Sequence, residues 1–174
     1  MPQANKVRNI CIHCSAGFGD KNSILAFWKS KGWKSVGYHR LVDLNGIIHE
    51  LADFSAITNG VLGFNESTIH ICYIGGIEKV GNTFKAKDTR TPKQIQAIDE
   101  CIQDAIKWLM KNGKDVTKDL GIVGHFDFSP DKNGSGVIES FERIKECPSF
   151  NVIKSDIHYL YSSKDRYGKL PTQK

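Results

Sequence analysis

Long apolar runs are absent from this sequence. No uninterrupted hydrophobic stretch approaches the ~20 residues that a membrane-spanning helix needs, so membrane insertion is not expected. The first residues, MPQANKVRNICIHC, contain neither the apolar core nor the cleavage site of a secretion signal. These absences predict a chain that is synthesised in the cytoplasm without a Sec signal.

Paired cysteines and dense basic clusters are also scarce. The five cysteines are an odd number, which argues against a disulfide framework and favours free or metal-bound thiols. The C-x-x-C pattern from Cys11 to Cys14 has no second copy, so a four-cysteine zinc ribbon is not expected. The net charge is +5, but Lys and Arg do not cluster among aromatic residues. The charge therefore favours anionic partners in general or simply promotes solubility, and no nucleic-acid partner is expected.

Length and composition indicate one compact domain. A chain of 174 residues with 40% hydrophobic and 25% charged residues can bury a core of ordinary size. No internal repeat, low-complexity tract or linker divides it. We predict a single monomeric domain that spans residues 1–174, with its core at about 8–162 and a polar tail at 163–174.

Several segments have the patterns of β-strands. Residues 7–14 alternate so that Cys11 and His13 share one face. Residues 36–51 are predicted to form a β-hairpin because Asn-Gly at positions 45 and 46 is a strong turn signal. Two further segments are short apolar runs typical of buried strands: residues 67–76 and 120–125.

Two helices are predicted among these strands. The first spans about 23–33 and ends near Gly32. The second runs from Thr91 to about Asn112, and its Thr-Pro-Lys-Gln start has the pattern of a capping box with proline at the first helical position. Irregular structure is expected elsewhere, apart from a short helix near 155–161; the main irregular segments are 52–67 and 77–91. The expected fold class is α/β, a single domain with a central mixed β-sheet flanked by helices.

Two of the six histidines lie at the ends of predicted strands. His13 and His125 stand where an α/β sheet exposes side chains to a crevice, and Cys147 follows at a turn bounded by proline. Two imidazoles and a thiolate form a plausible zinc set with a fourth position left for water. Zinc lowers the pKa of such a water and polarises a carbonyl, which is hydrolase chemistry. Residues so far apart cannot be recognised as ligands by spacing, so structural histidines and a packing cysteine remain the alternative.

The segment between these last two residues contains a second metal pattern. Residues 131–142, DKNGSGVIESFE, place oxygen-bearing side chains at positions one, three and five of a calcium loop, glycine at six and glutamate at twelve. Ser135 is a weaker ligand than aspartate, and no good helix precedes the loop. The sequence therefore leaves two interpretations of this loop open, a structural Ca²⁺ site and a metal-free acidic surface loop.

The order of short motifs provides a family resemblance. From about Arg8 to Phe150, the chain resembles the zinc-dependent N-acetylmuramoyl-L-alanine amidases, which include the amidase-type phage lysozymes and the catalytic peptidoglycan recognition proteins. The motifs are IHCSAG, a helix ending in GW, VGYH, NGIIHEL, STIHICYIGG, TPKQ, GH and KECPSF. The resemblance implies the fold of that family and a catalytic Zn²⁺ bound by His13, His125 and Cys147.

The resemblance also implies two catalytic helpers. Tyr38 would orient or activate the zinc-bound water, and Lys145 would stabilise the oxyanion of the tetrahedral intermediate. Tyr38 as a cap of the hairpin and Lys145 as a solvated surface residue are the alternatives. His49 and His70 are further candidates to line a substrate groove, although the family more often has a small residue at the position of His70.

The function that the resemblance implies is cleavage of the amide between N-acetylmuramic acid and L-alanine. The partner would be peptidoglycan or a soluble muropeptide. An endolysin-like enzyme would reach the wall through a holin or a secretion apparatus. A non-catalytic peptidoglycan-binding module and a cytoplasmic muropeptide-recycling amidase are the alternatives, and the presence of all three ligand residues favours an enzyme over the binding module.

Overall fold

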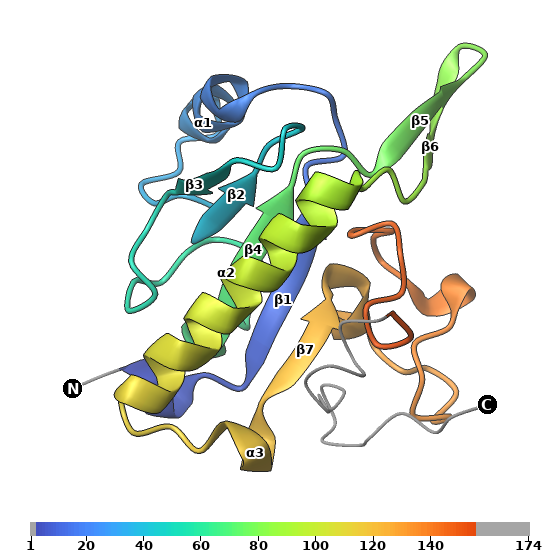
Figure 1. Ribbon diagram of the computed structural model, residues 1–174. Helices are drawn as coiled ribbons and strands as arrows, with labels where there is room; N and C mark the ends of the chain where they lie inside the picture. The colour runs from blue at the N-terminus through green and yellow to red at the C-terminus, as the bar shows by residue number, and fades with distance from the viewer. Residues whose placement is uncertain (1–2, 156–174) are drawn as a thin grey trace.

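The computed structural model describes residues 3–155, which form a five-stranded sheet with helices packed around it (Figure 1). The strand order is β3-β2-β4-β1-β7, with β3 antiparallel to β2 and the other pairs parallel. The strands are Asn9–Cys14 (β1), Arg40–Val42 (β2), Ile48–Glu50 (β3), Thr68–Tyr73 (β4) and Gly121–Gly124 (β7). This arrangement confirms the predicted single domain of α/β class with a mixed sheet.

Helix α2, Pro92–Lys111, covers one face of the sheet (Figure 1). Its buried stripe includes Ile98 and Ile102, which belong to the same core cluster as Ile12 of β1 and Ile71 of β4. These helix positions recur at the spacing of an amphipathic helix, which is why the pattern predicted α2 correctly. The main hydrophobic core therefore lies between α2 and the sheet.

The opposite face of the sheet carries histidine and cysteine side chains. Cys11 and His13 of β1 and His70 of β4 are fully buried there. Helix α1, Lys21–Ser30, lies on this side, and its Ile24 packs against the small cluster that includes Leu41. The predicted alternation of β1 is thus confirmed, and it places polar, metal-binding residue types on the face away from α2.

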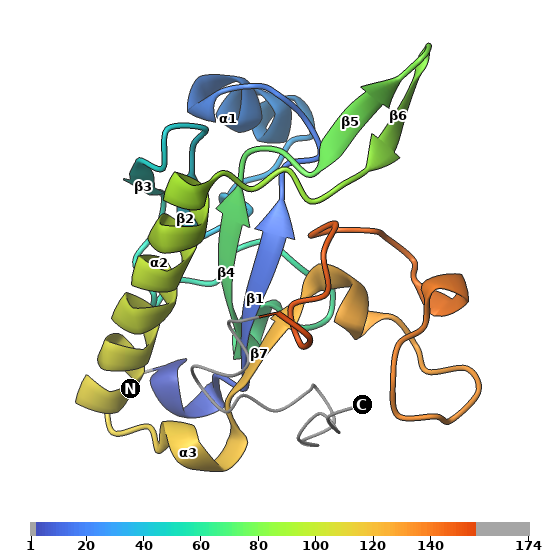
Figure 2. The same ribbon diagram turned by 45° about the vertical axis from the view of Figure 1, so that its right-hand side comes forward.

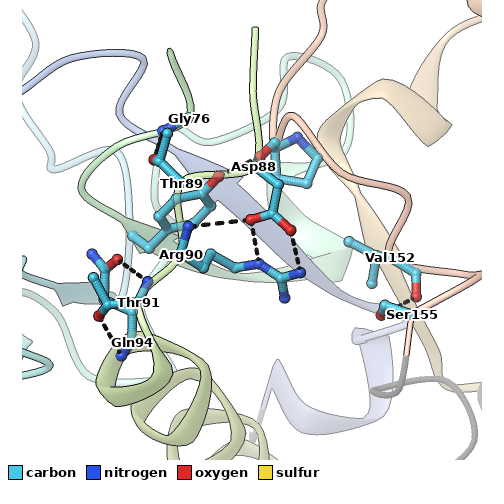
Figure 3. Close-up of polar contacts among 10 residues, drawn as sticks. Gly76, Asp88, Thr89, Arg90, Thr91, Gln94, Val152 and Ser155 are labelled. Atoms are coloured by element: carbon cyan, nitrogen blue, oxygen red, sulfur yellow. Dashed lines mark hydrogen bonds and ion pairs between the residues drawn. The ribbon is translucent and has the colours of Figure 1, made fainter. Parts of the chain in front are cut away.

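The start of α2 is fixed by side chains (Figure 3). Thr91 Oγ1 accepts a hydrogen bond from the Gln94 backbone nitrogen at 3.2 Å, and Gln94 Oε1 accepts from the Thr91 nitrogen at 3.0 Å. This confirms the predicted capping box. Next to it, Arg90 pairs with Asp88, and its guanidinium lies 3.3 Å from the ring centroid of Phe150. That contact joins the start of α2 to the segment that returns to the sheet after β7.

Residues 77–91 differ from the prediction of an irregular segment. Strands β5 (Ile77–Val80) and β6 (Thr83–Ala86) form an antiparallel hairpin that projects from the body of the molecule (Figure 2). Their side chains are partly or fully exposed on both faces, so no hydrophobic alternation marks them in the sequence.

Other short elements were also missed by the sequence patterns. They are the helix α3 (Val116–Asp119) and 3₁₀ turns at Gln3–Lys6, Asn65–Ser67, His125–Phe128 and Ser140–Glu142. The helix predicted near 155–161 and the tail at 163–174 lie outside the described residues. Within residues 3–155, no helix is both long and apolar enough to span a bilayer.

Candidate metal centre

Three side chains from distant parts of the chain meet at the carboxyl end of the sheet. Nδ1 of His13 lies 3.1 Å from Nδ1 of His125 and 3.7 Å from Sγ of Cys147. The ligand atoms of these three residues all lie within 4.8 Å of one another. The structure therefore brings together the residues that the sequence singles out as zinc ligands, while their binding of zinc stays a prediction.

The pairing of two parallel strands explains how the histidines meet. Ile12 of β1 pairs with Gly124, the last residue of β7, so His13 and His125 each follow one of these two paired residues. Because β1 and β7 run in the same direction, both side chains emerge at the same edge of the sheet. His13 is fully buried and His125 is half-buried, so the cluster reaches from the core to the surface.

Backbone contacts hold Cys147 beside these histidines. Its carbonyl oxygen accepts a hydrogen bond from the Phe126 nitrogen at 2.8 Å, and its sulfur accepts one from the Cys14 nitrogen at 3.3 Å. The Tyr73 hydroxyl donates to the carbonyl oxygen of the next residue, Pro148, at 2.7 Å. The long segment after β7 is thereby fastened to β1 and β4 at the point where Cys147 is needed.

The chemistry of this donor set fits a zinc ion. Burial lowers the pKa of His13 well below its usual range, and burial together with the nearby Lys145 ammonium lowers the pKa of His125 to about 4. Both imidazoles are therefore neutral at pH 7 and keep a lone pair for a metal. Burial raises the pKa of the Cys147 thiol well above its usual range, and a bound cation would reverse that shift by stabilising the thiolate. Two imidazole nitrogens and one thiolate are ligands that Zn²⁺ favours.

Tyr38 and Lys145 both lie close to the cluster. The Tyr38 ring centroid is 4.9 Å from that of His13 and 5.2 Å from that of Trp28. Burial raises the pKa of the Tyr38 phenol well above its usual range, so the hydroxyl remains a hydrogen-bond donor. Lys145 is exposed, and its charge contributes to the lowered pKa of both His13 and His125. The roles of Tyr38 and Lys145 in catalysis remain predictions.

His70 lies beneath the cluster and does not line a groove. Its side chain is fully buried, and its Nδ1 lies 3.0 Å from Nε2 of His13. Cys11, His13 and His70 form a second group of ligand atoms within 4.8 Å of one another, all buried. The sequence analysis lists His70 as a candidate to line a substrate groove. Its contact with His13 could not be predicted, because the contact depends on the register of β1 and β4. His49 is elsewhere, on the β2–β3 hairpin, and its Nε2 lies 3.0 Å from Asp43 Oδ2.

The loop at residues 131–142 gives the calcium interpretation no support. The buried Glu142 carboxylate accepts hydrogen bonds from the backbone nitrogens of Lys132 and Glu139 at 2.7 and 2.9 Å. The Asp131 carboxylate accepts from the nitrogen of Gly136 at 2.7 Å. The loop is therefore closed by its own acidic side chains, which accept hydrogen bonds from backbone amides.

Comparison with known proteins identifies the family. The family model described as N-acetylmuramoyl-L-alanine amidase matches residues 3–150. An endolysin of Enterobacteria phage K11 is 26% identical over 145 residues, covering 81% of this chain and 80% of the endolysin. The chain therefore belongs to the N-acetylmuramoyl-L-alanine amidase family, as the motifs predict.

Solved structures with the same fold include two proteins from different sources. One is the N-acetylmuramoyl-L-alanine amidase LysC from Clostridium intestinale, with a TM-score of 0.63, 19% identity, and coverage of 93% of this chain and 89% of LysC. The other is wild-type Drosophila PGRP-LB, with a TM-score of 0.56, 18% identity, and coverage of 82% of this chain and 74% of PGRP-LB. At these identities the likeness concerns the fold.

Proposed function

We propose that this chain is a zinc-dependent peptidoglycan amidase that cleaves the bond between N-acetylmuramic acid and L-alanine. The observation that carries the proposal is the convergence of His13 Nδ1, His125 Nδ1 and Cys147 Sγ within 4.8 Å at the edge of the sheet. Membership of the amidase family supports the same substrate bond. A non-catalytic binding module has no chemical need for such a donor set.

His13, His125 and Cys147 would hold the zinc ion, and each has the chemistry for that task. When bound, zinc supplies an activated water and polarises the carbonyl of the scissile amide. His125 and Cys147 are only half-buried, so we expect substrate to approach the ion from their side. The buried His13 anchors the site to β1, which restrains the geometry of the whole set.

Tyr38 and Lys145 would act on the reacting groups from two sides. The protonated Tyr38 phenol would donate a hydrogen bond that orients the water or the carbonyl oxygen. The Lys145 ammonium would stabilise the negative charge that develops on that oxygen during attack. Its exposed position allows the side chain to reach a substrate that approaches from solvent.

An endolysin-like role is the biological setting that the relatives favour. The matched relative from Enterobacteria phage K11 is an endolysin. In that setting the chain would act on the cell wall after release from the cytoplasm by a holin-type or secretory route. Recycling of soluble muropeptides is the alternative within the same chemistry, so both substrates belong in the test.

Mass spectrometry of digested substrate tests the proposal. Purified peptidoglycan and a soluble muropeptide would be incubated with the zinc-loaded protein, with the chelated protein, and with the chelated protein after zinc is restored. We expect new L-alanine amino termini and intact glycan chains, with cleavage lost on chelation and recovered with zinc. Cleavage at a different bond, or cleavage that survives full removal of metal, would refute the proposed reaction.

A further inference from the structure

A second histidine contacts the metal-ligand candidate that is most deeply buried. His70 of β4 places Nδ1 at 3.0 Å from Nε2 of His13, and both side chains are fully buried. The other nitrogen of His13, Nδ1, faces His125 and Cys147. His13 thus has one ring nitrogen at the metal centre and the other at His70.

This geometry fixes where the protons of both rings must lie. If His13 binds zinc through Nδ1, its proton is on Nε2, because a neutral imidazole carries one proton. That N–H can donate only to an unprotonated Nδ1 of His70, whose own proton must then lie on Nε2. Within residues 3–155, Nε2 of His70 is buried without a hydrogen-bond partner. The hydrogen bond of the His70 ring is therefore directed at His13.

Two neighbouring residues contact the backbone and the ring of His70. Its backbone nitrogen donates to Nδ1 of His39 at 2.9 Å, and Nε2 of His39 lies 3.0 Å from the carbonyl oxygen of Ala56. Gly60 lies directly against the His70 ring, because a Cβ atom at Gly60 would collide with Cγ and Nδ1 of His70. Glycine at position 60 therefore provides the space that allows an imidazole at position 70.

We propose that His70 is a positioning residue that sets the tautomer and ring orientation of His13 for metal binding. The inference rests on the proposed zinc site. Outer partners of metal-bound histidines act in this way, and their loss commonly weakens metal affinity about 10–100-fold. Here the acceptor is a neutral imidazole. Gly60 leaves room for its ring, and Nδ1 of His39 accepts a hydrogen bond from the His70 backbone nitrogen.

Zinc affinity of two variants tests the inference without reference to activity. His70→Leu removes the acceptor, and we expect the zinc dissociation constant, measured by chelator competition, to rise about 10–100-fold. His70→Asn places an oxygen near the position of Nδ1, so its zinc affinity should stay within about threefold of the wild type. His70→Leu removes the buried Nε2–H of His70 that has no partner, but it also leaves Nε2 of His13 without its partner. Because these two effects oppose each other, the metal-free variant should unfold at a temperature close to that of the wild type. Equal zinc affinity of all three proteins would overturn the inference.

A pair of smaller substitutions tests the contact with Gly60. Gly60→Ala alone should displace the His70 ring and weaken zinc binding. In the background of His70→Ala, which removes the ring, the same change at position 60 should have little further effect on zinc affinity. Equal effects of Gly60→Ala in both backgrounds would mean that the contact does not serve the metal site.

Nuclear magnetic resonance of the zinc-loaded wild type needs no substitution. Long-range correlation between ring protons and ring nitrogens should show His13 and His70 both protonated at Nε2. A proton on Nδ1 of His70 would contradict the inference.

Two bound zinc ions per wild-type chain and one per His70→Asn chain would also overturn it, since His70 would then be a ligand in the Cys11–His13–His70 group. Failure of the wild type to bind zinc would instead refute the proposed function itself.

Discussion

The thiol of Cys147 is the sulfur ligand of the proposed metal centre. Its sulfur lies 3.7 Å from Nδ1 of His13 and accepts a hydrogen bond from the backbone of Cys14. Loss of an outer partner of a metal ligand lowers metal affinity or activity by up to about 100-fold. Because Cys147 would be a ligand itself, Cys147→Ser should lower the zinc affinity and the cleavage rate by more than that. Zinc content and muropeptide cleavage would be measured together. Cys101→Ser is the matched control, because Cys101 is buried on α2 away from the site and both properties should persist.

Substitution of Lys145 separates an effect on the catalytic step from an effect on zinc binding. Lys145→Ala should lower kcat about 100-fold, at the low end of the range for an oxyanion donor because this side chain is exposed. Its zinc content should not change. Lys132→Ala, at another exposed lysine on the same returning segment, should leave kcat unaltered. Equal kcat for the two variants would remove Lys145 from the mechanism.

At the scale of elements, the loop at 131–142 is organised around one buried carboxylate. Glu142 accepts hydrogen bonds from the backbone nitrogens of Lys132, Asn133 and Glu139. Glu142→Gln replaces an acceptor oxygen by a donor that faces these N–H groups. We expect a loss of about 1–3 kcal/mol in the free energy of unfolding, measured by chemical denaturation. Glu139→Gln, at an exposed neighbour, should cost less.

The same loop gives a test for calcium. Because its carboxylates bind backbone amides, addition of Ca²⁺ should leave the unfolding midpoint of the wild type unchanged. A midpoint that rises with calcium concentration, and does so less in Glu142→Gln, would establish the ion site that the sequence pattern suggests.

Elements with a buried face could be predicted from the sequence. Helix α2 and the central strands have hydrophobic patterns because one face packs in the core, and the capping box at Thr91 follows from local hydrogen bonding. The β5–β6 hairpin has no such face, so its sequence resembles an irregular segment. The sequence pattern could place His13 and His125 at the ends of strands, but only the family resemblance implied that they share one site with Cys147, since the pairing of β1 with β7 is not visible in the sequence. The contact of His70 with His13 could not be predicted, because it depends on strand register and on the space at Gly60.

At the scale of the whole molecule, buried histidines make the metal-free protein sensitive to acid. Burial lowers the pKa of His13 and His70 well below the usual range, and that of His39 and His125 to about 4. Since these pKa values are lower in the folded chain than in the unfolded chain, the unfolded chain binds more protons as the pH falls. The free energy of unfolding should thus be highest above about pH 6.5 and decrease as the pH falls toward 4. The lowered pKa of His39 alone would account for about 3 kcal/mol of this decrease. Urea unfolding at several pH values measures this, and a free energy of unfolding that stays constant from pH 7 to pH 5 would contradict it.

X-ray absorption at the zinc edge of the zinc-loaded protein tests the central claim most directly. The account predicts one zinc per chain with a first shell of two nitrogens at about 2.0–2.1 Å, one sulfur at about 2.3 Å and a light atom from water. The sulfur signal should disappear in any zinc retained by Cys147→Ser and persist in Cys101→Ser. A first shell without sulfur in the wild type, or a folded protein that binds no zinc, would contradict the metal centre formed by His13, His125 and Cys147.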